Sequence, residues 1–222
     1  MTPCYIVTFE IASWPQQLAE QCERLQLRPI IYDNNSSYPP MLEWLDSCPY
    51  EVIRSDHNGG CHGFGYAGMH DKQTGPYVLT DCDLDISGVP DDVVAKMTDA
   101  LVRYPTFGRA GLSLEVDDIP DSYPLKGHVH AREDGFWSTR LDDGCFDAAI
   151  DTTFALYDPE RDSQRKAHNY RAIRLDRPYT ARHIPWYLDL GNPTEEYQYY
   201  LERLHGPVVW SKANKHHIED SQ

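Results

Sequence analysis

The chain has 222 residues, of which 41% are hydrophobic and 25% charged, so it can form one domain with a buried core. Its formal charge of −15 argues against a nucleic-acid-binding surface, which would be basic. The charge does not exclude a nucleotide ligand, because a divalent metal can bridge carboxylates and phosphates. No apolar run approaches the roughly 18 residues of a membrane span, and no signal-peptide pattern is present. The six cysteines form no CxxC pair, which favours free thiols in a reducing compartment. We therefore expect a cytoplasmic protein without a membrane span.

Strand-like and helix-like patterns alternate along the first 105 residues. In chain order we expect strand 5–9, helix 15–27, strand 28–33, a short helix at 41–47, strand 50–55, a glycine-rich loop at 57–68, strand 76–81 and helix 90–104. This alternation favours a mostly parallel sheet with right-handed crossovers and helices on its faces.

The second half of the chain is less regular. Two further strands are expected at 106–116 and 148–157, separated by a polar, irregular stretch of about thirty residues. Residues 193–204 have the pattern of an amphipathic helix, and we expect the tail at 211–222 to be disordered.

The run "YVLTDCDLDI", residues 77–86, is an apolar strand pattern that ends in three carboxylates at every second position. In parallel α/β sheets, ligands bind at the carboxyl ends of strands, and Asp81 is the last residue of this expected strand. Side chains two residues apart on an extended chain point to the same side. Asp81 and Asp83 can therefore face one ion, with Asp85 as a third candidate. Hard oxygen ligands suit Mg²⁺ or Mn²⁺, particularly where substrate phosphates complete the coordination.

Other interpretations of these carboxylates are weaker. An EF-hand loop needs Gly at its sixth position and Glu at its twelfth, where this chain has Ile86 and Asp92. A dehalogenase-type phosphohydrolase carries its DxD motif on the first strand, and a solvated acidic turn remains the non-functional alternative. The segment "GFGYAG" at 63–68 matches GxGxxG, but it follows the third strand, whereas a dinucleotide fingerprint follows the first strand directly.

At four places the sequence resembles the GT-A-fold glycosyltransferases that use nucleotide sugars. "IVTF" is similar to their first strand, "IIYDNNSS" to a second-strand signature in which an Asp holds the base, and "NGG" to a turn near the nucleotide. "LTDCDLD" is similar to the DxD motif that binds metal and diphosphate. The likeness covers about residues 4–105 well and the remainder loosely. A DxD motif on a fourth strand, well after a "YDNNSS" second strand, is much more specific than DxD alone.

The resemblance implies an α/β fold of GT-A type, Rossmann-like, with a mixed, mostly parallel sheet and flanking helices. It implies that residues 1–105 bind the nucleotide sugar and that residues 106–210 form the acceptor side of the same domain. Asp81 and Asp83 then hold Mn²⁺ or Mg²⁺ on the diphosphate of the donor, with UDP as the favoured nucleotide.

The resemblance also implies residues for the nucleotide base. Thr8, Asp33 and Asn58 are expected to seat the nucleotide together with Asp81. An Asp at the end of the second strand can accept a hydrogen bond from the imino N–H of uracil or thymine, which makes Asp33 the candidate for base recognition. The alternative for Asp33 is a purely structural turn with the residues "NNSS" that follow it.

The acceptor side carries the catalytic candidates. An inverting transferase needs a carboxylate that takes the proton of the acceptor hydroxyl, for example on a glycan, and we expect Asp151 in this role, with Asp118 next. A late histidine completes the metal site in many members, and His183 is the candidate here. Three arginines are candidates for holding the diphosphate, and nothing in the sequence ranks them: Arg174, Arg177 and Arg182.

Two rival functions remain open. A nucleotidyltransferase acting on a sugar phosphate would share the architecture, but it typically has a glycine-rich, basic loop after the first strand, and "FEIASWPQQ" has neither glycine nor a basic residue. The second rival is a catalytically inactive module of the same fold that binds a sugar or nucleotide.

Overall fold

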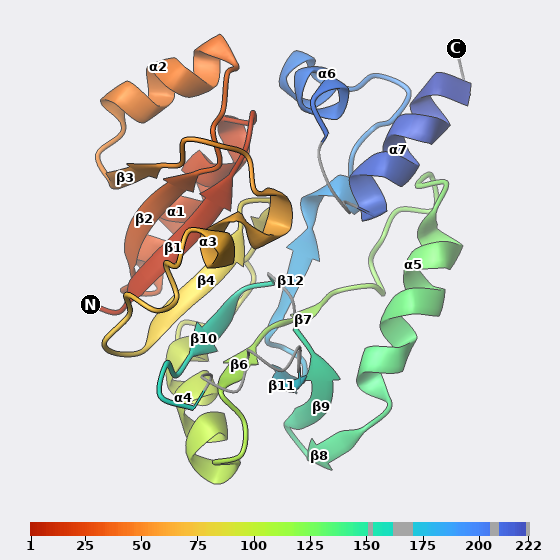
Figure 1. Ribbon diagram of the computed structural model, residues 1–222. Helices are drawn as coiled ribbons and strands as arrows, with labels where there is room; N and C mark the ends of the chain where they lie inside the picture. Colours follow the sequence, from red (N-terminus) through yellow and green to blue (C-terminus); the bar gives the residue numbers. More distant parts are fainter. Residues whose placement is uncertain (151–152, 162–170, 205–208, 221–222) are drawn as a thin grey trace.

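The computed structural model describes residues 1–150, 153–161, 171–204 and 209–220, and Figure 1 shows their arrangement. In these residues the strands are β1 (Pro3–Thr8), β2 (Arg28–Asp33), β3 (Glu51–Arg54), β4 (Tyr77–Asp81), β5 (Leu84–Asp85), β6 (Arg109–Gly111), β7 (Ser113–Leu114), β8 (Arg140–Asp142), β9 (Cys145–Ala149), β10 (Ala155–Tyr157), β11 (Arg171–Leu175) and β12 (Thr180–His183). The α-helices are α1 (Ser13–Arg24), α2 (Pro39–Ser47), α3 (Gly63–Tyr66), α4 (Val93–Arg103), α5 (Lys126–Glu133), α6 (Glu195–Glu202) and α7 (Val209–Asp220).

A mixed sheet forms the centre of the molecule. Within the described residues, its strand order is β3-β2-β1-β4-β10-β6-β11-β9-β8. The four strands from β3 to β4 are parallel, β10 is antiparallel to both of its neighbours, and β11 is parallel to β6. A small sheet, β5-β12-β7, lies beside it. The expected α/β class is confirmed.

Burial of both faces of the sheet explains why the first strands are nearly continuous apolar runs. Five of the six residues in β1 and in β2 are buried. On one face α1 and α4 pack through apolar stripes, in which Leu18, Met97 and Ala100 are fully buried. On the other face, α3 lies over an aromatic cluster that includes Phe64 and Tyr77.

The prediction of one strand at 106–116 is wrong in one respect. The segment forms two short strands, β6 and β7, which belong to different sheets. The division falls next to Gly111, where a Cβ atom would lie 2.5 Å from the carbonyl oxygen of Phe154. Leu112 donates a backbone hydrogen bond to that same oxygen at 3.0 Å. Only glycine allows the chain to pass this close to the neighbouring strand.

The strand expected at 148–157 is also divided. β9 ends at Ala149 and β10 begins at Ala155, and the two strands pair with different neighbours. Asp151 lies outside the described residues. The polar stretch between the two expected strands contains α5 and β8.

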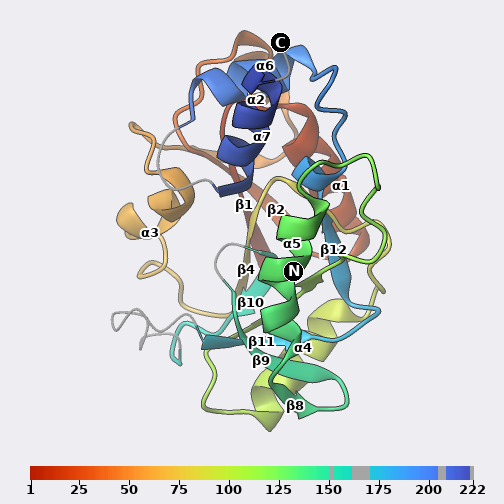
Figure 2. The same cartoon turned by 90° about the vertical axis from the view of Figure 1, so that its right-hand side faces the viewer.

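The prediction of a disordered tail at 211–222 is wrong for residues 211–220, which belong to α7. This helix packs against α6 and against the 3₁₀-helix η4 (Ile184–Trp186), and Figures 1 and 2 both show α7 beside α6. Ser211 and Asn214 are buried. The order comes from these tertiary contacts, which a local polar pattern does not reveal.

Two features of composition can be compared with the structure. All six cysteines are free, and four of them, including Cys4 and Cys22, are buried, as predicted. Among the described residues, none of the helices combines the length and the apolar character that crossing a membrane would take.

Candidate functional site

A pocket of about 270 Å³ lies at the carboxyl ends of β1 and β4, next to the chain that follows β2. Six residues singled out from the sequence line it: Thr8, Asn58, Asp81, Asp83, Arg174 and His183. They come from segments far apart in the chain, and the parallel arrangement of β2, β1 and β4 brings their carboxyl ends to one edge of the sheet.

Asp83 and His183 are in direct contact. Nε2 of His183 lies 3.1 Å from Oδ2 of Asp83, and the two side chains are 13% and 23% exposed, respectively. The pairing of β12 with β5 sets this contact, because it places His183 opposite Leu84, next to Asp83. The backbone N–H of Ile184 donates to the carbonyl oxygen of Asp83 at 2.8 Å. One carboxylate oxygen and one imidazole nitrogen are thereby held together at the pocket.

The other ring nitrogen of His183, Nδ1, is buried and makes no hydrogen bond with the described residues. In the part of the chain that the structure describes, its Nδ1 and the Nε1 of Trp186 are buried without a hydrogen-bond partner. The two rings pack with their centroids 4.7 Å apart. Most buried polar atoms in proteins are paired, so the two nitrogens are exceptions beside the pocket.

The carboxylates of the DxDxD run do not share one environment. Asp81 and Asp83 line the pocket, whereas Asp85 does not. The carboxylate of Asp85 accepts hydrogen bonds from Nε2 of Gln21 and from the backbone N–H of Ser87, both at 2.9 Å. The structure therefore does not support Asp85 as a third ligand. Among the described residues, no three Asp, Glu, His or Cys side chains converge in a complete metal centre.

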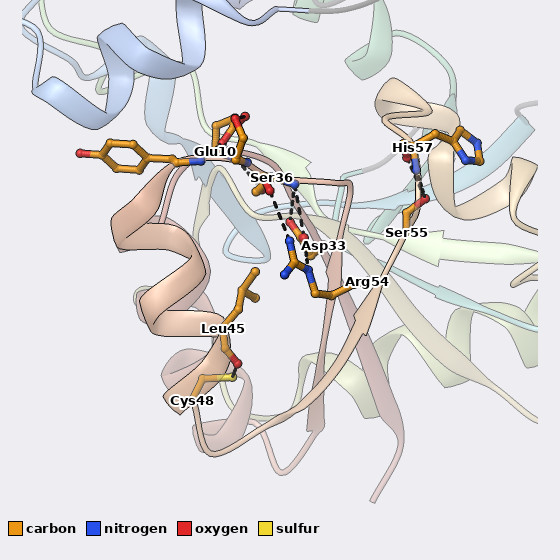
Figure 3. A network of polar contacts seen from close by, with 10 residues as sticks. Glu10, Asp33, Ser36, Leu45, Cys48, Arg54, Ser55 and His57 are labelled. Atoms are coloured by element: carbon orange, nitrogen blue, oxygen red, sulfur yellow. Dashed lines mark hydrogen bonds and ion pairs between the residues drawn. The ribbon is translucent and has the colours of Figure 1, made fainter.

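Asp33 holds a loop together. Its side chain is fully buried, and its carboxylate accepts hydrogen bonds from Nε of Arg54 at 3.0 Å and from the backbone N–H of Ser36 at 3.2 Å. Figure 3 shows Asp33 between these two partners. Asp33 does not line the pocket, whereas Asn34 does. The geometry accords with the structural alternative noted for this residue.

Glu10 fixes the same loop from the other side. It is buried and has φ of 59°, in the left-handed region that non-glycine residues rarely adopt. Its carboxylate accepts from the backbone N–H groups of Ser37 and Tyr38 at 2.8 and 2.6 Å. Its own N–H donates to Oγ of Ser36 at 2.8 Å, and Figure 3 shows Glu10 beside Ser36. The turns after β1 and β2 are therefore joined into one unit beside the pocket.

Asn34 and Asn58 join this unit to the glycine-rich loop. Nδ2 of Asn34 donates to Oδ1 of Asn58 at 3.0 Å and to the carbonyl oxygen of Gly60 at 2.9 Å. Oδ1 of Asn58 also accepts from the N–H of Gly60 at 2.8 Å. These bonds fix the orientation of the Asn58 amide and leave its Nδ2, among the described residues, without a hydrogen-bond partner.

Glu133 is a pocket residue that the sequence analysis missed. It is 3% exposed, and its carboxylate pairs with Nη1 of Arg174 at 3.1 Å. Burial raises the pKa of the Glu133 carboxyl, although the Arg174 guanidinium opposes the shift. Helical spacing could have indicated that Glu133 points inward. It follows the fully buried Val129 by four residues, so the two side chains lie on the same face of α5.

The three arginines have different positions. Arg174 lines the pocket and lies with its guanidinium 4.0 Å from the ring centroid of Phe136. Arg177 pairs with Asp117, and Arg182 pairs with Asp118, on the surface. Arg174 is therefore the one of the three that the structure brings to the pocket.

Asp118, a candidate base, does not line the pocket. Its carboxylate accepts from Nε of Arg182 and from the hydroxyl of Tyr187, each at 2.6 Å. Burial acts in the opposite direction, but these hydrogen bonds lower the pKa of the Asp118 carboxyl. A carboxylate held in this way is a poor proton acceptor.

Aromatic side chains also line the pocket. They are Phe9, Trp14, Phe136, Tyr200 and Trp210. Trp210 comes from the first turn of α7 and packs edge-on against Trp186 with centroids 5.6 Å apart. The pocket thus combines groups for a charged ligand with surface for an apolar face.

Comparison with solved structures identifies the fold. The chain is similar to a mannosyltransferase from Pyrobaculum calidifontis in complex with GDP-Man and Mn²⁺, with a TM-score of 0.50 and 15% identity over 98% of this chain and 68% of that chain. The chain has a GT-A-type fold. The expected GT-A fold class is thereby confirmed.

Weaker likenesses accompany this one. Glucosyl-3-phosphoglycerate synthase from Mycobacterium tuberculosis, with Mn²⁺ and UDP-glucose, has a TM-score of 0.45 and 9% identity over 72% of this chain and 56% of that chain. A UDP-glucose pyrophosphorylase has a TM-score of 0.41 and 12% identity over 92% of this chain and 100% of that chain. No family model matches the sequence, and no curated protein matches it.

Proposed function

We propose that the protein is a metal-dependent glycosyltransferase that transfers a sugar from a nucleoside diphosphate sugar to a hydroxyl acceptor such as a glycan. The contact between Asp83 and His183 carries the proposal, because it brings a carboxylate oxygen and an imidazole nitrogen together in a pocket at the carboxyl edge of the sheet. The mannosyltransferase of the same fold, which contains GDP-Man and Mn²⁺, supports it.

Asp83 and His183, with Asp81 beside them, would hold the metal. Oxygen and imidazole nitrogen ligands fit Mn²⁺ well, and Mg²⁺ is the alternative. A divalent ion bound there neutralises the charge that develops on the departing diphosphate. Among the described residues no three such side chains converge, so oxygen atoms of the donor and water would complete the coordination.

The nucleoside would extend across the sheet from this pair. Val7 of β1 pairs with Asp81 of β4 on one side and with Tyr32 of β2 on the other. Two strand spacings are about 10 Å, which suits the reach of a nucleoside from its phosphates to its base. Thr8 is the last residue of β1, the middle strand of the three, and Asn58 is hydrogen-bonded to Asn34, which directly follows β2. Asp33 then supports the base indirectly, by holding the loop, and UDP remains the favoured nucleotide.

The acceptor hydroxyl needs a carboxylate that takes its proton. Apart from Asp81 and Asp83, Glu133 is the one described carboxylate that lines the pocket. A raised pKa brings a carboxylate closer to the working range of a general base. Asp151, which was expected in this role, follows the buried Ile150 and precedes the pocket residue Thr153. We assign the proton transfer to Glu133 and retain Asp151 as the alternative.

Calorimetry tests the donor site. UDP, dTDP, GDP and their common sugars are titrated with and without Mn²⁺ into the wild type, Asp83→Asn and Asp85→Asn. We expect one diphosphate to bind in a Mn²⁺-dependent manner, with at least a tenfold loss, about 1.4 kcal/mol, in Asp83→Asn. Asp85→Asn is the matched control, because Asn can still accept the bonds from Gln21 and Ser87.

Absence of Mn²⁺-dependent binding for every diphosphate would contradict the proposal. Release of the diphosphate from a bound sugar donor in the presence of a panel of hydroxyl acceptors separates a transferase from an inactive binding module.

The six free cysteines support the cytoplasmic location that forms part of this proposal.

A further inference from the structure

The C-terminal helix α7 contributes directly to the candidate site. Val209, Trp210 and Ser211 from its first turn line the pocket. The helix lies beside α6 in both views of the molecule and contacts η4, which directly follows His183 (Figures 1 and 2). The position of α7 is therefore linked to the segment that carries the imidazole.

One buried amide makes this link. Asn214 has no exposed surface, and its side chain forms three hydrogen bonds. Oδ1 accepts from the hydroxyl of Tyr123 at 2.8 Å, and Nδ2 donates to the carbonyl oxygen of Pro185 and to the hydroxyl of Tyr197, each at 3.0 Å. The amide therefore joins the loop before α5, the 3₁₀-helix η4 and helix α6.

The bond to Pro185 has a particular consequence. Pro185 lies in η4, between Ile184 and Trp186. At the start of η4, Ile184 is bound to the carbonyl oxygen of Asp83, and at its end the ring of Trp186 packs on that of His183. Asn214 holds the middle of the same short helix. The segment that orients His183 is thus fixed to Asp83 on one side and to α7 on the other.

We propose that Asn214 is a positioning residue that sets the imidazole of His183 against Asp83 through its hydrogen bond to Pro185. The inference rests on the proposed function, because it concerns the pair to which we assign the metal. Residues that orient metal ligands typically change metal affinity by about 10–100-fold when they are replaced.

The variant Asn214→Asp removes this bond selectively. An ionised carboxylate can accept from both Tyr123 and Tyr197, whose hydroxyls are able to donate, but it cannot donate to the carbonyl of Pro185. Because burial favours the protonated acid, which could donate to Pro185, the loss is also measured in Asn214→Ala, which has no donor in any protonation state. Tyr123→Phe is the matched control, because it also deletes one bond of the same buried amide and leaves the link to Pro185 intact. Asn214→Ala, which adds no charge, replaces Asn214→Asp if the latter does not fold.

The experiment titrates Mn²⁺ in the presence of UDP or GDP and follows the free ion by electron paramagnetic resonance. We expect Asn214→Asp to weaken Mn²⁺ binding about tenfold, whereas Tyr123→Phe lowers the melting temperature and leaves the Mn²⁺ affinity within about twofold of the wild type. In the His183→Ala background, Asn214→Asp should cause no further loss, because the two residues act through one interaction.

Each other outcome is decisive. Equal effects of Asn214→Asp and Tyr123→Phe on Mn²⁺ affinity, or an undiminished effect of Asn214→Asp in the His183→Ala background, would show that Asn214 has a general structural role. Mn²⁺ binding that survives His183→Ala would overturn the inference and leave the proposed function standing. If the wild type does not bind Mn²⁺ with UDP, GDP or any other nucleoside diphosphate, both fail.

Discussion

His183 contacts Asp83 through Nε2 and Oδ2 at 3.1 Å, although the two residues come from distant segments of the chain. The pairing of β12 with β5 produces this contact, and it places an imidazole nitrogen beside a carboxylate oxygen. A mixed donor set of this kind suits Mn²⁺ better than Mg²⁺, which prefers oxygen ligands and retains its water.

Metal preference is the first prediction. We expect the wild type to bind Mn²⁺ more tightly than Mg²⁺ in the presence of its nucleotide. We expect His183→Asp to reduce the ratio of Mn²⁺ affinity to Mg²⁺ affinity, because it replaces the proposed nitrogen ligand with an oxygen ligand. Calorimetric titration of both ions measures the ratio. Asp85→Asn is the control, and an unchanged ratio in His183→Asp would remove His183 from the metal site.

Base selectivity is the second prediction. The bonds from Asn34 and Gly60 to Oδ1 of Asn58 leave Nδ2 as a donor at the pocket. A donor there favours bases that carry a carbonyl oxygen where cytosine and adenine carry an amino group, so UDP, dTDP or GDP should bind more tightly than CDP and ADP. Asn58→Asp keeps the accepting oxygen and replaces the donor, so the ratio of UDP to CDP affinity should fall by at least tenfold, about 1.4 kcal/mol.

The control for this change is Asn35→Asp, which adds the same charge at an exposed neighbouring position. Calorimetry with the five diphosphates and saturating Mn²⁺ compares the two variants. A uniform loss for every base in Asn58→Asp would mean that Asn58 supports the loop without contacting the base.

The catalytic carboxylate is the third prediction. Glu133→Gln retains an oxygen for Arg174 but cannot take a proton. We expect donor binding within about threefold of the wild type and a fall in turnover of at least about 100-fold, the lower range for a general base. The steady-state rate of diphosphate release is measured in Glu133→Gln and in Asp151→Asn. The variant that loses turnover identifies the residue that takes the proton. Full turnover in Glu133→Gln with loss in Asp151→Asn would favour the original candidate.

The ion pair of Asp118 supplies the fourth prediction, which concerns stability. The hydrogen bonds from Arg182 and Tyr187 lower the pKa of the Asp118 carboxyl in the folded protein, despite the opposing effect of burial. A lowered pKa in the folded state adds stability above the ordinary Asp pKa of about 3.9, and this contribution is lost as the pH falls through the lower, folded-state pKa.

We therefore expect Asp118→Asn to reduce the free energy of unfolding at pH 7 by about 0.5–1 kcal/mol, a modest value because the pair is partly exposed and screened by solvent. The difference from the wild type should shrink below about pH 4. Urea denaturation at several pH values measures it. Asp121→Asn, at a more exposed carboxylate with its own Lys126 partner, is the comparison, and a difference that grows toward acid pH would contradict the assignment.

Much of the structure of residues 1–105 follows from local sequence patterns. The apolar runs at β1, β2 and β4 are long enough to be identified as buried strands, and Asp81 and Asp83 follow directly from the end of β4. The alternation with helices then predicts parallel strands whose carboxyl ends meet at one edge. Strand identity and carboxylate spacing are properties of neighbouring residues, so the sequence is sufficient for them.

The remainder of the site depends on contacts between distant segments. Glu133 lines the pocket because it lies on the same face of α5 as the buried Val129. Asp33 does not line the pocket, because its carboxylate is bound to Arg54 and to the backbone of Ser36. The order of α7 depends on Asn214 finding three partners in other elements. Composition gives no sign of these pairings, because burial and hydrogen-bond partners are set by the packing of segments that are separated along the chain.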